Sequence, residues 1–215
     1  MLSATASLVS ASDLPPCPPS GIWHNCYGEM VSAGGTGKYV GEWRNGDFNG
    51  HGLWIFSHDG GTNEYKGTFL NGEFQDGIGN ATYFETTYIG EYKKGKYHGK
   101  GSIFRNQKLV YEGSFEAGLE NGYGIYFFPT DQDIDWGNFP VPIKYEGFYE
   151  KGKFHGEGVL TYKNETVKEG IWQDGWFEYE KNVAPPTFAS KRPEQDNEII
   201  SASSGSGFAV SADGY

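Results

Sequence analysis

The chain has 215 residues and a formal net charge of −11 at pH 7, with 28 acidic side chains against 17 lysines and arginines. Nucleic acid is excluded as an expected partner, because phosphate binding needs a cluster of basic side chains. The same acidity disfavours contact with an anionic membrane surface, although membrane contact is left open. Glycine and aromatic residues are both abundant, so the core must be built mainly from rings.

The N-terminal residues precede any regular pattern. Residues 1–20 are expected to form a flexible leader that ends in PPCPPS, and residues 21–38 a degenerate first unit that acts as an N-terminal cap. Cys17 and Cys26 could form one disulfide in an exported protein, or remain two free thiols in a reducing compartment. Localisation is therefore unknown, with the cytoplasm as the default and an exported form as the alternative.

From Tyr39 onward the chain repeats one pattern of glycines and aromatic residues. Units that start at Tyr65, Tyr88 and Tyr111 are spaced by 23 residues, and the same spacing separates Tyr145 from Lys168. A fixed period in the twenties is typical of a repeat array. The expected units are 39–64, 65–87, 88–110, 111–144 with an insertion, 145–167 and a partial unit 168–181.

Within each unit the period is two, which indicates β-strands. Tyr39, Gly41 and Trp43 fall on one face of a strand, and a second alternating run comes after them in the same unit. Two such runs joined by a turn predict a β-hairpin. We expect the turn at the residue before the third glycine of the unit, because Asn, Asp and His tolerate positive φ. These expected turn residues are Asn49, Asp76, His98, Asn121 and His155.

A meander of hairpins makes one long sheet with no second sheet to bury its face. The rings must then lie flat on the sheet, and glycine at the cross-strand position supplies the space. Each unit buries its rings against the next, so stability accumulates along the array. The predicted fold class is all-β, an elongated single-layer antiparallel sheet of stacked β-hairpin repeats.

The unit, written Y-x-G-x-[FWY]-x-x-G-x-x-x-G-x-G, resembles the MORN repeat (membrane occupation and recognition nexus), and the resemblance covers residues 39–181. Two departures stand out. The second unit has an extra residue between Gly72 and Gly77, expected as a bulged turn, and the last unit has Lys168 in place of the first tyrosine. The unit from Tyr88 matches every position, through Tyr88, Gly90, Tyr92, Gly95, Gly99 and Gly101.

The resemblance implies a twisted antiparallel sheet used for protein–protein contact and scaffolding, often with self-association. We expect the ring-bearing face to be both core and binding surface, because Tyr and Trp suit interfaces. The alternative is that the rings only brace one another. The partner is expected to be a protein or peptide, with a homodimer as a further option. The predicted partner-binding residues are Tyr39, Trp43, Tyr65, Phe69, Tyr88, Tyr92, Tyr111, Phe115, Tyr145 and Tyr149.

Other functions are disfavoured by the residues that they would need. Asp131, Asp133 and Asp135 alternate as in a calcium loop, but Trp136 and Pro142 stand where that loop needs glycine and glutamate, so no metal site is expected.

No catalytic constellation is visible either. Glu42, Glu91 and Glu146 are expected on the strand face opposite the rings, in solvent. We therefore expect a non-catalytic protein without a cofactor. The alternative is a repeat protein that binds carbohydrate, a cell wall or a lipid surface. Residues 182–215 are rich in Ser and Gly and poor in aromatic residues, so they are expected to be a disordered tail.

Overall fold

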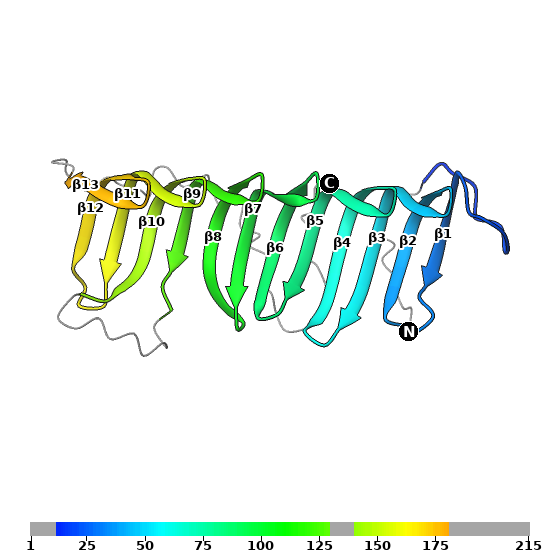
Figure 1. Ribbon diagram of the computed structural model, residues 1–215, viewed down its shortest axis with the longest axis horizontal. Helices are drawn as coiled ribbons and strands as arrows, with labels where there is room; N and C mark the ends of the chain where they lie inside the picture. Colours follow the sequence, from blue (N-terminus) through cyan, green and yellow to red (C-terminus); the bar gives the residue numbers. More distant parts are fainter. Residues whose placement is uncertain (1–11, 130–139, 181–215) are drawn as a thin grey trace, which may run out of the picture. The chain divides into compact units, whose positions relative to one another are not determined.

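The structure, a computed structural model, describes residues 12–129 and 140–180. These residues form thirteen strands of one antiparallel sheet, and the order of strands in the sheet is their order in the chain. Figure 1 shows them as a row of hairpins from β1 to β13. The predicted all-β, single-layer sheet of hairpin repeats is therefore confirmed. Within the described ranges, no helix is long and apolar enough to span a membrane.

Each strand has five to twelve residues, and short turns join most neighbours. The strands are β1 Cys26–Val31, β2 Gly37–Arg44, β3 Asp47–His58, β4 Gly61–Leu70, β5 Glu73–Tyr83, β6 Thr86–Lys93, β7 Lys96–Arg105, β8 Lys108–Glu116, β9 Leu119–Phe127, β10 Pro142–Glu150, β11 Lys153–Tyr162, β12 Val167–Gln173 and β13 Trp176–Glu180.

Three expectations concern residues beyond these ranges. Residues 1–11 of the expected leader, the aspartates of the insertion at 131–135 and the expected tail at 182–215 lie outside the described residues. The predictions of a flexible leader, of no calcium site and of a disordered tail therefore stay predictions.

The predicted turn position is wrong. The hairpins turn at the second glycine of the unit, where Asn45 has φ 55° and Gly46 has φ 86°. Two successive residues of positive φ form the tight hairpin turn whose twist matches that of the flanking strands. The same pair recurs at Asn71-Gly72, Lys94-Gly95, Ala117-Gly118, Lys151-Gly152 and Asp174-Gly175.

The residues expected in turns lie inside strands instead. His98, for example, is in β7 without positive φ, and Gly99 after it has φ 57°. Here the register shifts between Gly90 and Glu91, so this glycine forms a β-bulge. A Glu91 carboxylate oxygen accepts the Lys100 N–H at 2.8 Å, which satisfies one backbone group that the bulge frees from the ladder. Asn49, Asp76, Asn121 and His155 lie in strands in the same way.

Rings lie over pairs of glycines, as expected. Gly90 and Gly101 face each other across β6 and β7, and the Tyr88 ring covers both. A Cβ on Gly101 would lie 2.4 Å from the Tyr88 Oη and 2.6 Å from a ring carbon, which no side chain allows. The same arrangement recurs for Tyr39, Tyr111 and Tyr145.

The second unit departs from this plan. Gly67 pairs with Gly77, but the atoms nearest to either position are backbone atoms rather than a ring. Tyr65 lies instead against Gly79 and is only half-buried. The extra residue does not change the turn, which is again an Asn-Gly pair at Asn71-Gly72. The expected bulge lies in the strands instead, where the register shifts between Thr68 and Phe69.

This irregular unit divides the core. One cluster of buried residues holds Tyr39, Trp43 and Phe69, and a larger one runs from Tyr88 to Trp172. Tyr65 and Phe74 pack against both clusters and connect them.

The N-terminal edge of the sheet is covered by the chain itself. Tyr27 in β1 donates its N–H to the Pro15 carbonyl at 2.8 Å, and Cys17 donates its N–H to the Tyr27 carbonyl at 2.9 Å. A disulfide joins Cys17 to Cys26, and the Cys17 side chain lies against Gly28. An exposed edge strand invites pairing with another chain, so this proline-rich segment protects β1.

The glycine pairs generate a first prediction. Gly101→Ala should lower the free energy of unfolding by about 1–3 kcal/mol, because the new methyl group displaces the Tyr88 ring. Gly37→Ala is the matched control, since a Cβ there meets other atoms only at 3.5 Å or more. Its effect should stay within about 0.5 kcal/mol in urea denaturation. Equal losses in the two variants would contradict the ring-on-glycine account.

The edge cover generates a second prediction. Replacing both cysteines, Cys17→Ser with Cys26→Ser, should speed amide hydrogen exchange in β1 and β2 and leave β10 to β12 unchanged, because each repeat contacts only its neighbours. Loop-closure entropy gives an upper estimate of about 2–3 kcal/mol for the local loss. A reductant should have no further effect on the double variant. Faster exchange along the whole sheet would contradict local tethering.

Candidate interaction face

The structure brings all ten predicted partner-binding residues into the aromatic core of the sheet. Nine of them are buried, with exposures from 0% to 8%, and Tyr65 is half-buried. Side chains this deeply covered contribute mainly packing and little accessible surface. Their part in binding a partner stays a prediction.

Each buried tyrosine is held by rings on several sides. Tyr88 stacks on Tyr97 with ring centroids 3.7 Å apart, and meets Tyr92 and Phe115 edge-on at 5.2 Å each. Phe115 belongs to the next unit, so the packing joins neighbouring hairpins. Edge-on and offset pairs suit the charge distribution of aromatic rings and stabilise by about 0.5–1.5 kcal/mol each beyond burial. Tyr39 stacks on Phe48, and Tyr145 on Phe154, in the same way.

These stacking rings are functional residues that the sequence reasoning missed. They stand two residues after the second glycine of the unit, in G-x-F or G-x-Y. That recurrence was a visible signal, and it places them directly opposite the second ring of the unit, as in Tyr92 with Tyr97. The stacking residues are Phe48, Tyr97 and Phe154; Phe74, at the same position of the second unit, lies tilted against Tyr65 and Phe69 instead.

Unlike the rings beneath them, the stacking residues are only partly buried. Together with other half-buried apolar residues of this face they form what we call the accessible row. The accessible row consists of Phe48, Trp54, Tyr65, Phe74, Tyr97, Ile103, Tyr126, Phe154, Leu160 and Phe177.

Buried tyrosines also keep their hydroxyls paired. The Tyr88 hydroxyl donates to the Glu91 carbonyl at 2.8 Å, and the Tyr145 hydroxyl to the Phe148 carbonyl at 3.2 Å. Burial raises the pKa of both hydroxyls, because the phenolate would lose its hydration. Tyr149 differs: its hydroxyl is buried and has no hydrogen-bond partner in the part of the chain that the structure describes.

The raised pKa values generate a third prediction. A buried phenol stays neutral in the folded state at a pH where the unfolded chain already ionises, so its stabilising contribution is complete below pH of about 10 and is lost as pH rises above it. Urea denaturation at pH 8 to 11, with phenolate absorbance as the probe, should show this fall. Tyr145→Phe should weaken the pH dependence, while Tyr83→Phe, at a site 76% exposed, should not. A stability curve that is flat to pH 11 would contradict the burial account.

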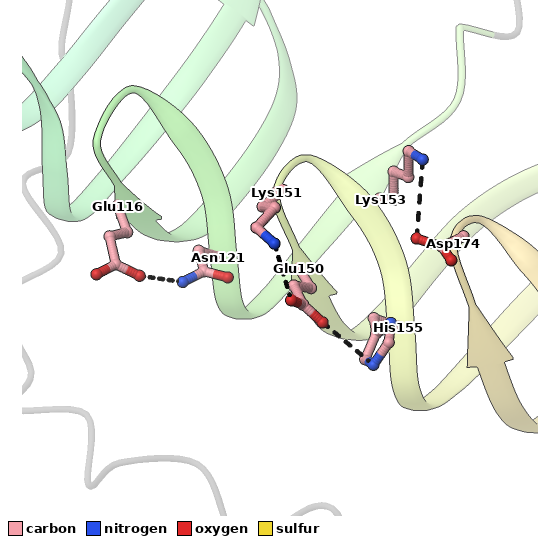
Figure 2. A network of polar contacts seen from close by, with 7 residues as sticks. All are labelled: Glu116, Asn121, Glu150, Lys151, Lys153, His155 and Asp174. Carbon is pink, nitrogen blue, oxygen red and sulfur yellow. Dashed lines mark hydrogen bonds and ion pairs between the residues drawn. The ribbon is translucent and has the colours of Figure 1, made fainter.

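Polar side chains gather at the turn edge of the sheet, where hairpins β8–β9, β10–β11 and β12–β13 end. Figure 2 shows Glu116 with Asn121, Glu150 with Lys151 and His155, and Lys153 with Asp174. The three ion pairs span 3.3 to 3.7 Å between exposed side chains, so each contributes little to stability. His155 lies across the hairpin from Glu150, and its contact is therefore one of the protein surface.

Catalytic or metal-binding chemistry finds no support in the residues described. Within residues 12–129 and 140–180, no group of three or more His, Cys, Asp or Glu side chains could hold a metal ion. Glu42 accepts a hydrogen bond from Ser12 at 3.0 Å, and Glu91 is occupied by the bulge of its hairpin. Carboxylates that serve as acceptors for the chain itself have an evident structural role.

Fold and face together define a class of protein: an open array of β-hairpin repeats, held by rings laid on glycines, with a partly accessible aromatic face. The model of the MORN repeat family matches this chain at residues 39–57, 88–106, 111–132 and 145–167. The chain thus carries MORN repeats in these four segments, and the resemblance read from its sequence is confirmed. The matched segments leave out the irregular unit that starts at Tyr65.

Among curated proteins, the chain is similar to alsin from Rattus norvegicus, with 37% identity over 90 residues, and to alsin from Homo sapiens, with 36% identity over 90 residues. It is also similar to the ALS2 C-terminal-like protein of Homo sapiens, with 30% identity over 91 residues. Each match covers 42% of this chain, but only 5% of alsin and 9% of the ALS2 C-terminal-like protein. The likeness therefore concerns the repeats, which are in general interaction and scaffold modules.

Proposed function

We propose that this protein is a non-catalytic scaffold that binds a segment of a partner protein along the accessible row. The observation that supports the proposal is a series of half-buried aromatic and aliphatic side chains on one face of a sheet that the described residues leave in a single layer. An extended apolar face of this kind usually marks an interaction site. The buried tyrosines support the row from beneath and fix its geometry.

A protein segment fits this face better than a glycan. The rings of the row pack against one another and against the buried rings, with Trp54 stacked on Tyr65 at 5.7 Å and Tyr97 stacked on Tyr88. Faces used in such stacks are closed to a sugar ring, whereas the remaining edges and hydroxyls suit apolar and hydrogen-bonding side chains. The net charge of −11 disfavours an anionic lipid surface.

The fourth prediction tests which face binds. A photo-crosslinking phenylalanine analogue at Tyr97, on the accessible row, should join the chain to a defined partner protein in the native cell. The same analogue at Ser102 is the matched control, because Ser102 lies in the same strand and points to the other face. Crosslinks at Ser102 and none at Tyr97 would assign the binding face to the other side. Retention of the wild-type chain on a glycan column would favour the carbohydrate alternative.

A further inference from the structure

One hairpin carries a charge where the others carry a ring. In five hairpins the residue of the second ring position faces an aromatic residue across the turn, as Tyr149 faces Phe154. In the β8–β9 hairpin, Phe115 faces Glu120 instead. Directly opposite residues of an antiparallel pair share a face, so this carboxylate belongs to the ring-bearing side.

The substitution is unfavourable within the sheet. The face of an aromatic ring is electron-rich, so a carboxylate beside Tyr111 is repelled where Phe154 is attracted to Tyr145. Burial and then the charge of Glu120 both raise the pKa of Tyr111, which shows that the two groups are close. Within residues 12–129 and 140–180, no ion pair or hydrogen bond joins the Glu120 side chain to another group.

A buried tyrosine of the next unit packs against Tyr111 as well. Its hydroxyl, on Tyr149, has no hydrogen-bond partner among residues 12–129 and 140–180, and the Tyr149 side chain is only 6% exposed. The Tyr149 ring meets the Tyr111 ring edge-on at 5.2 Å. Burial, neighbouring tyrosines and the charge of Glu120 raise the pKa of Tyr149. A Glu120 carboxylate oxygen lies against Gly152, at the turn just after Tyr149.

Elsewhere in the array a cation lies against a ring of the same face. In the last unit Lys168 replaces the first tyrosine, and its ammonium group lies 4.2 Å from the centre of the Phe177 ring. A cation is thus compatible with the aromatic row, whereas an anion without a counter-charge is not.

We propose that Glu120, on the ring-bearing face of the β8–β9 hairpin, forms a binding site for an arginine side chain of the partner protein. A planar guanidinium can stack on aromatic rings and donate two parallel hydrogen bonds to the carboxylate. Lysine lacks the planar group for stacking. This inference rests on the proposed function, because it names the chemistry of one contact on the accessible row.

The test uses the full-length chain with ¹³C-labelled tyrosine rings and Nα-acetyl-arginine methylamide as the probe. Saturable shifts of the Tyr111 and Tyr149 resonances are expected with this probe, and none with the near-isosteric neutral citrulline analogue. Glu120→Gln should weaken binding about 10-fold to 100-fold, the range expected for loss of a charge-assisted pair. Glu116→Gln, at an exposed carboxylate of the same hairpin, is the matched control and should bind as the wild type does.

Glu120→Phe is the sharper variant, because it restores the ring found at this position in the other hairpins. It should abolish arginine binding and raise the melting temperature, which separates loss of the site from loss of the fold. Equal shifts with arginine and citrulline probes, unchanged binding in Glu120→Gln, or no saturation at all would each overturn the proposal. If the arginine probe bound only to the Arg192→Ala variant, Arg192 of the chain's own C-terminal segment would occupy the site in the wild type. That result would overturn the assignment of the site to a partner protein.

Failure of this inference and failure of the proposed function can be told apart. If Tyr97 gives a crosslink but the arginine probe does not bind, only the arginine site is ruled out. If the arginine probe binds but Tyr97 gives no crosslink, the accessible row is ruled out as the docking surface and only an isolated arginine site is left.

Discussion

The structure depends on one packing relation, a tyrosine ring laid flat across two glycines of neighbouring strands. A single-layer sheet has no facing layer, so it must supply its own apolar cover from the side chains that it carries. A ring buries roughly 150–250 Å², but it reaches the backbone only where no Cβ intervenes. At Gly101 the space that a methyl group would need is filled by Tyr88. Ring and glycine pair are therefore one unit of structure, and neither can change alone.

This relation also explains why the repeats form a continuous array. The second ring of each hairpin lies edge-on to the first tyrosine of the hairpin before it, as Phe115 does to Tyr88. Each unit is thus completed by its successor. The second unit breaks the relation, because Tyr65 does not cover the pair of Gly67 and Gly77. The core accordingly divides there into two clusters, which only the half-buried rings of Tyr65 and Phe74 connect within the described residues.

The fold was predictable because the repeat period, the alternation of residues and the spacing of glycines all indicate the same packing of rings on glycine pairs. The position of the turns and the register of individual strands were less predictable. Asn and His before Gly50 and Gly99 look like turn residues, yet Asn45-Gly46 supplies two successive positive φ angles and fixes the turn. In β4 and β5, the pairing of Gly67 with Gly77 rather than with Gly79 is a choice of register that only the three-dimensional structure decides. The pairing of Cys17 with Cys26 was left open, because spacing alone does not show that the leader returns to β1.

A sheet whose core is also its outer face must divide its aromatic residues between two tasks. The first tyrosine of each regular hairpin is buried and defines the backbone spacing, while the stacking ring above it is only partly buried. A substitution at the lower position would break the sheet, whereas one at the upper position changes the surface presented and costs only the stacking contact. Glu120 occupies such an upper position, over a tyrosine that remains buried. The residue at the stacking position can therefore differ from hairpin to hairpin and give the face chemical specificity, while the packing of tyrosines on glycine pairs that holds the array together stays the same.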